Sequence, residues 1–256
     1  MKFSQVKFLF QSFKLIALII LALMVNCTHK ISYSAAVDSA KVELEMLNRT
    51  TLETIDQDDF NQHLDRAEHF IDIAISQQPD SAEANGLYAR VLLARGDVEQ
   101  AYSYAYRAFQ LDSLNYQANL SMGNVMRRLG DLNSAELHYK RALKINSADN
   151  YGVFALALLQ QQRKHFTEAE SLLVILTERE PHNLRFLYSL ATVYEEQFDL
   201  IKSAEVYEQL LEMENDNPEL WRSYARVIEM GGDTNRARHY NFIADSLQYH
   251  LHDSLN

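Results

Sequence analysis

The sequence predicts an all-α protein, a right-handed α-solenoid of stacked antiparallel helix pairs. Three observations support this: few glycines and prolines, a recurrence every 34 residues, and small residues at fixed places within it. The chain has 256 residues but only seven glycines and three prolines, whereas average usage would give about 18 and about 13. Turns use these residues heavily, so their scarcity indicates helices joined by short loops. The hydrophobic content of 47 % excludes an intrinsically disordered chain.

The N-terminus has the composition of a signal peptide. Lys2, Lys7 and Lys14 precede an unbroken apolar run of eleven residues, 15–25. At about 1.5 Å per residue the run reaches about 16 Å, roughly half of a hydrocarbon core, which is too short for a comfortable membrane span. That length suits the apolar region of a signal peptide, so we expect residues 1–26 to be removed from the mature protein.

The only cysteine, Cys27, follows this segment directly. Its position resembles that of the lipidated cysteine of bacterial lipoproteins, in which the thiol takes a diacylglyceryl group before cleavage. Asn26 departs from that pattern, which prefers a small residue there. The resemblance implies lipid attachment at Cys27, a tether over 27–35, and a place on the periplasmic side of the envelope, at the outer membrane. Cleavage near Ser34-Ala35-Ala36, giving a soluble periplasmic or secreted protein, and a retained signal anchor remain alternatives.

The period of 34 residues is the strongest signal in the chain. Gly96-Asp97 recurs 34 residues later as Gly130-Asp131, and four periods after the first as Gly232-Asp233. This frame defines five repeats over 82–251, namely 82–115, 116–149, 150–183, 184–217 and 218–251. The eighth and twentieth places of all five repeats hold only Ala, Gly or Ser: Ala89, Gly123, Ala157, Ala191, Ala225 and Ala101, Ala135, Ala169, Ser203, Ala237. Small residues there would let two helices approach closely.

In period and residue type the repeats resemble the tetratricopeptide repeat family. Aromatic residues and a proline stand at family positions: Trp221, Tyr194, Tyr139, Tyr207 and Pro181. Each repeat should form two helices of about fourteen residues, with a Gly-Asp turn in which glycine takes φ > 0. Lys164 and Phe198 replace that glycine in repeats three and four, so we expect those turns to be longer or differently capped.

The ends of the chain depart from the repeat pattern. We expect 36–81 to be a divergent N-terminal repeat and cap, with a helix at about 36–48. Residues 48–62 then read as a loop and a helix start, and 252–256 as a tail. The formal charge is −11, and loss of the three lysines of 1–26 would make it −14. Such a chain has no electrostatic footprint for nucleic acid.

No catalytic constellation occurs in the sequence. Phosphate-binding glycine loops, zinc-protease and serine-hydrolase patterns are absent, and the nine histidines are scattered. A lone cysteine also rules out an intramolecular disulfide. We therefore expect no enzyme activity, no cofactor and no metal site.

The resemblance implies a scaffold of the bacterial envelope that binds a protein or peptide segment in a concave groove lined by first helices. Carried onto this chain, the groove positions are Arg90, Leu93, Leu120, Asn124, Arg127, Arg128, Tyr151, Phe154, Leu158, Arg185, Tyr188 and Thr192. The alternative for Tyr151 and Phe154 is packing between repeats. A lipidated chain of this layout resembles the pilotin lipoproteins that assemble type IV pilus secretins. A spacer or oligomerisation module, or a regulatory arm of an envelope enzyme complex, is the alternative. The sequence names neither the partner nor the oligomeric state.

Overall fold

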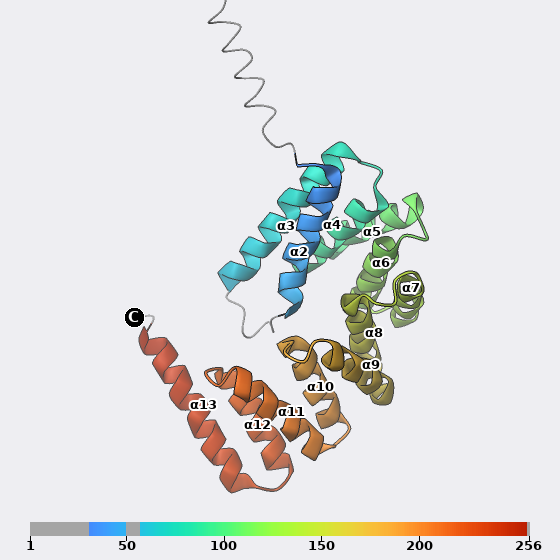
Figure 1. Cartoon of the computed structure of the whole chain (residues 1–256). Helices are drawn as coiled ribbons and strands as arrows, with labels where there is room; N and C mark the ends of the chain where they lie inside the picture. The colour runs from blue at the N-terminus through green and yellow to red at the C-terminus, as the bar shows by residue number, and fades with distance from the viewer. Residues whose placement is uncertain (1–30, 50–56, 255–256) are drawn as a thin grey trace, which may run out of the picture.

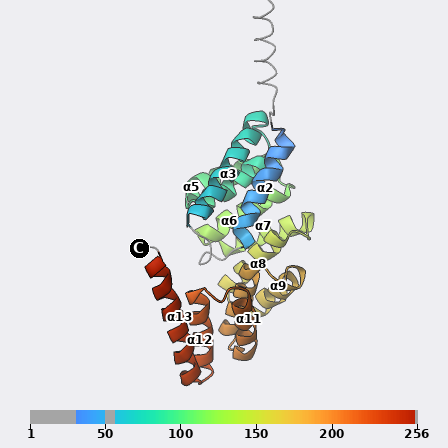
Figure 2. The same ribbon diagram turned by 60° about the vertical axis from the view of Figure 1, so that its left-hand side comes forward.

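The computed structural model describes residues 31–49 and 57–254, and in these two ranges it contains helices and no strand. Figure 1 shows the helices as consecutive pairs that follow one another in an arc from α2 to α13, and Figure 2 shows the same order from a second side. This confirms the predicted all-α solenoid. In chain order the helices are α2 (Tyr33–Arg49), α3 (Gln57–Gln77), α4 (Ala82–Ala94), α5 (Val98–Leu111), α6 (Tyr116–Leu129), α7 (Leu132–Ile145), α8 (Asn150–Gln162), α9 (Phe166–Arg179), α10 (Leu184–Glu196), α11 (Leu200–Met213), α12 (Pro218–Met230) and α13 (Thr234–Ser254).

The first helix of every repeat begins at the first residue of the predicted frame, at 82, 116, 150, 184 and 218. The residue before each start explains why. In all five cases it is Ser, Asn or Asp, and its side chain accepts a hydrogen bond from a backbone N–H of the first turn. Such N-caps satisfy donors that the helix itself leaves unpaired. The capping residues are Ser81, Asn115, Asp149, Asn183 and Asn217.

The small residues lie in the seams between helices, as predicted. Nine of the ten at the eighth and twentieth places are buried Ala or Ser, with exposed fractions of 2 % or less. The tenth, Gly123, is the tightest. A Cβ built there would lie 2.5 Å from Cδ1 and Cε1 of the Tyr139 ring, so only glycine lets the buried tyrosine pack against α6.

The two turns without glycine are not longer than the others, and only the one after α8 is differently capped, because His165 makes no side-chain cap hydrogen bond. Lys164 and Phe198 adopt φ of 61° and 60°, close to the αL conformation that Gly96 and Gly130 take at φ 85°. The hydrogen bonds are also the same: Lys164 N donates to Gln161 O, as Gly96 N donates to Leu93 O. Turn length is therefore retained because packing imposes it, and a non-glycine residue carries the conformational strain.

The N-terminal pair begins earlier than predicted. α2 starts at Tyr33, so the last residues of the predicted tether 27–35 are helical. Four apolar residues of α2 are 0–3 % exposed and pack against Leu64, Ala67 and Ile71 of α3 and against α4; they are Ala36, Val37, Ala40 and Leu44. Helix α2, which the 34-residue pattern did not place, is thus part of the hydrophobic core.

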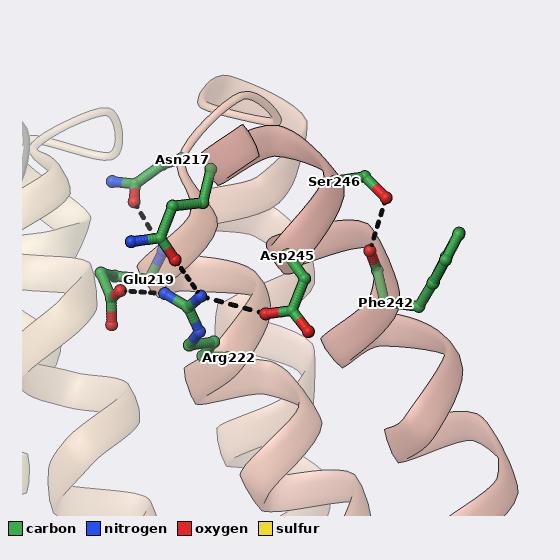
Figure 3. Close-up of polar contacts among 7 residues, drawn as sticks. Asn217, Glu219, Arg222, Phe242, Asp245 and Ser246 are labelled. Carbon is green, nitrogen blue, oxygen red and sulfur yellow. Dashed lines mark hydrogen bonds and ion pairs between the residues drawn. The ribbon is translucent and has the colours of Figure 1, made fainter. Parts of the chain in front are cut away.

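The last pair closes the other end. Trp221 of α12 stacks on Tyr240 of α13, with ring centroids 5.7 Å apart. Figure 3 shows Arg222 of α12 between Glu219 of its own helix and Asp245 of α13, whose Oδ1 lies 3.1 Å from Nη2. α13 continues to Ser254, so the predicted tail from 252 is helical at its start.

Candidate partner-binding groove

The first helices α4, α6, α8 and α10 line one face of the solenoid, called the inner face below. A cavity of about 450 Å³ opens on it. Apolar side chains of the N-terminal pair form one wall, namely Leu44, Leu47 and Phe60. The end of α4 and the turn after it add Leu93, Ala94, Arg95 and Gly96. Polar and aromatic side chains of the four first helices complete the lining, and we call the cavity the arginine pocket: Arg90, Asn124, Arg127, Arg128, Tyr151 and Arg185.

Tyr151 of α8 is the centre of this wall. The guanidinium carbon of Arg90 lies 4.0 Å from the centroid of its ring. Asn124 Nδ2 donates a hydrogen bond to Tyr151 Oη at 3.2 Å, and Tyr139 Oη donates to Asn124 Oδ1 at 2.8 Å. Burial alone would raise the pKa of the Tyr151 phenol, but Arg90, Arg185 and Arg127 together outweigh burial and lower this pKa below its usual value.

The arginine pocket concentrates positive charge. No Asp or Glu belongs to the described lining, and no ion pair of Arg90, Arg127 or Arg128 occurs in the part of the chain that the structure describes. Arg95 at the rim is the exception, because its Nη2 lies 2.7 Å from Asp65 Oδ1 and 2.6 Å from Glu68 Oε2. In a chain with a net charge of −11, this concentration of cations is a local reversal of sign.

Two further observations show that these arginines are close together and partly dehydrated. Burial is the main cause of a lowered pKa for the Arg185 guanidinium, and the positive charges of Arg127 and Arg90 add to it. The Nε–H of Arg127 is buried and has no hydrogen-bond partner. A buried donor without an acceptor costs about 1–3 kcal/mol.

Helix α2 closes the pocket on one side. It contacts α3 and α4, and its last turn reaches α10, where Arg185 Nη1 donates to the Leu47 carbonyl at 3.3 Å. The C-terminal end of a helix carries partial negative charge, which favours a guanidinium there. Because α2 is anchored by buried residues, it acts as a fixed wall, and the inner face is divided by it.

The pocket contains seven residues of the predicted groove, namely Arg90, Leu93, Asn124, Arg127, Arg128, Tyr151 and Arg185. Other predicted residues serve the core instead. Leu120 and Phe154 are each 1 % exposed, and the Phe154 ring packs on Phe186 with centroids 5.0 Å apart. For Phe154, the alternative of packing between repeats describes the structure.

Leu158 and Tyr188 are partly buried against neighbouring repeats and do not line the arginine pocket. Sequence reasoning missed the wall made by Leu44, Leu47 and Phe60. A helix was expected at about 36–48, but no residue in it marked contact with α10.

The described part of the chain contains no group of three or more His, Cys, Asp or Glu side chains that could hold a metal ion. Among the described helices, none is long and apolar enough to cross a bilayer. The predicted signal peptide and Cys27 lie outside the described residues.

Comparison with known families agrees with the period found in the sequence. Two family profiles, both described as Tetratricopeptide repeat, match the chain. One matches residues 60–115 and 154–218, and the other matches residues 116–149. No curated protein is a significant match to the sequence.

Several solved structures share the fold. One is MamA 41-end from Desulfovibrio magneticus RS-1, at a TM-score of 0.59 and 17 % identity over 66 % of this chain and 95 % of that chain. Another, titled as the functional characterisation of Pseudomonas aeruginosa pilF, has a TM-score of 0.58 and 16 % identity over 81 % of this chain and 90 % of that one. YrrB, described as a TPR protein with an unusual peptide-binding site, has a TM-score of 0.57 and 15 % identity over 70 % and 92 %. At these identities the likeness concerns the fold alone.

Proposed function

This chain belongs to the tetratricopeptide repeat proteins, and we propose that it is a non-catalytic scaffold whose inner face binds an acidic segment of a partner protein. Repeat solenoids of this kind use extended concave surfaces for binding. One observation carries the proposal: arginines from α4, α6 and α10 line one cavity whose described lining contains no Asp or Glu. Opposite charge on the partner would speed encounter and set its register.

The roles of individual groups follow from their contacts. Arg127 and Arg128 would meet carboxylates of the partner. Tyr151 and the apolar wall of Leu44 and Leu47 offer a surface for an apolar side chain beside those carboxylates. Asn124 already bridges Tyr139 and Tyr151, so its contribution is to hold the Tyr151 hydroxyl in place more than to hold the partner's backbone.

A charge reversal with a matched control tests the proposal. Arg127→Glu/Arg128→Glu should abolish capture of the partner from detergent-solubilised envelope, and should slow association and reduce its salt sensitivity with the purified partner. Arg141→Glu/Lys144→Glu makes the same charge change on exposed positions of α7 in the same repeat, and should leave capture intact. Equal capture by the two variants at low salt would refute the groove assignment and favour the spacer or oligomerisation role.

We also propose that the protein is lipid-anchored at the periplasmic side of the outer membrane. The support is the signal-like segment 1–26 followed by Cys27. Cys27→Ser should leave the protein uncleaved or soluble, because the lipid attachment site is lost. Intact-mass measurement of the mature protein tests this, and an unmodified N-terminus at Val37 would contradict it.

Within this proposal, assembly of an envelope secretin is the more specific role. Its support is the lipoprotein-like N-terminus together with the shared fold of the pilF structure, which covers 81 % of this chain. Deletion of the gene should then reduce the amount of heat-stable secretin multimer in the outer membrane. Unchanged multimer levels would leave the scaffold proposal standing and remove this role.

A further inference from the structure

We propose that the arginine pocket is also a binding site for a small phosphate-bearing anion, which would compete with the partner for the same cations. The inference rests on the proposed function only in locating binding on the inner face. Its direct test needs no partner protein.

The first argument is charge balance. Arg90, Arg127 and Arg128 each bring one positive charge to the cavity, with no ion pair among the described residues. A single carboxylate carries one negative charge and would leave most of this repulsion in place. A phosphate group carries about −1.5 to −2 at neutral pH and would balance more of it at one position.

The second argument is the direction of the donors. The guanidinium groups of the pocket stand on three helices: Arg90 on α4, Arg127 and Arg128 at successive positions of α6, and Arg185 on α10. Such an arrangement favours a ligand whose acceptor oxygens point in several directions. A carboxylate accepts hydrogen bonds mainly in its own plane, whereas phosphate oxygens point in tetrahedral directions. Arginine forks suit phosphate oxygens in a bidentate manner.

The third argument is enclosure. α2 closes one side with Leu44 and Leu47, and the cavity of about 450 Å³ lies within the range of small-molecule sites, about 300–1,000 Å³. The apolar wall further suits a ligand with a non-polar portion beside its phosphate.

Tyr151 provides an internal reporter of occupancy. Its pKa is lowered because arginines surround the ring, and an anion beside those arginines would cancel part of their field. Pyrophosphate should therefore move the ionisation of Tyr151 to higher pH, as measured by absorbance of the phenolate. Tyr151→Phe should remove the transition that moves, which assigns it.

The experiment uses the full chain in detergent and inorganic pyrophosphate as the probe. Calorimetric titration should show saturable binding, and Arg90→Gln/Arg127→Gln should weaken it by about tenfold or more, since the double variant loses two charged hydrogen-bond donors. Arg141→Gln/Lys144→Gln, with the same charge change on α7, should bind like wild type. Circular dichroism checks that both variants retain their helices.

Two results would overturn the inference. One is equal pyrophosphate affinity for wild type and Arg90→Gln/Arg127→Gln, together with an unmoved Tyr151 titration. The other is tighter binding of N-acetyl-Asp-Asp-amide than of pyrophosphate, which would make the pocket a site for acidic peptide alone. Partner capture that depends on Arg127 and Arg128 without any pyrophosphate binding would remove this inference and keep the proposed function. Pyrophosphate binding with partner capture insensitive to both arginines would do the reverse.

Discussion

The turn between α8 and α9 is the place where a small change should stabilise the solenoid most. Lys164 sits at φ 61°, and the following N-cap, His165, makes no side-chain cap hydrogen bond. At the equivalent places of repeat two, Gly130 supplies the αL residue and Asp131 accepts from Ser134 N at 3.0 Å. The double change Lys164→Gly/His165→Asp therefore installs the local solution that the chain already uses elsewhere.

The magnitude follows from two terms. Replacing a non-glycine residue in the αL conformation by glycine relieves about 1–2 kcal/mol of strain in the folded state. Glycine's extra freedom in the unfolded chain offsets about 0.4–1 kcal/mol of that stabilisation. An Asp cap in place of a residue without a cap hydrogen bond adds about 1 kcal/mol. His165 has φ −86° and ψ 66°, close to the −80° and 78° of Asp131, so the new cap needs no backbone change. The sum is about 1.5–2 kcal/mol.

Thermal unfolding followed by circular dichroism measures the effect. For a chain of this size, about 2–4 °C per kcal/mol gives a rise in Tm of about 3–8 °C. Phe198→Gly is the control, because Phe198 also has a positive φ of 60° but Asp199 already caps α11. In this variant only the relief of backbone strain should raise the Tm, so the increase should be smaller. A double variant that melts at or below the wild-type temperature would refute the strain and capping account of these turns.

Two other predictions concern buried positions. Gly123→Ala should destabilise the protein by about 1–3 kcal/mol, because its Cβ would lie 2.5 Å from the Tyr139 ring. The substitution should also disturb the contact between Asn124 and Tyr151. Denaturant unfolding measures the loss of stability, and an unchanged midpoint would contradict the packing. His138, packed edge-on against Phe109, has its pKa lowered by burial and secondarily by Arg141. His138 in the unfolded chain therefore binds a proton at higher pH than in the folded protein, so stability should fall as pH drops below about 6.5. His138→Gln should flatten this pH dependence in denaturant titrations between about pH 7 and pH 5. An equal slope in both proteins would exclude His138 as the cause.

Local chemistry in the sequence determined the repeat architecture. The N-caps before residues 82, 116, 150, 184 and 218 and the small seam residues specify where helices start and how closely they pair. These signals are readable because capping and small-residue packing act within a single 34-residue unit, and every unit repeats them. For the same reason, the first-helix positions Arg90, Asn124, Arg127, Arg128 and Tyr151 could be assigned to one surface.

Only the tertiary structure decided what that surface became. Lys164 and Phe198 hold the glycine conformation because packing of the flanking helices outweighs a local cost of about 1–2 kcal/mol each. The Phe154 side chain lies in the core because it packs against the ring of Phe186 in the next repeat. The arginine pocket exists because α2 folds back to α10, over a separation of 138 residues between Leu47 and Arg185. Such a contact depends on the accumulated curvature of the stacked pairs, which no single repeat encodes.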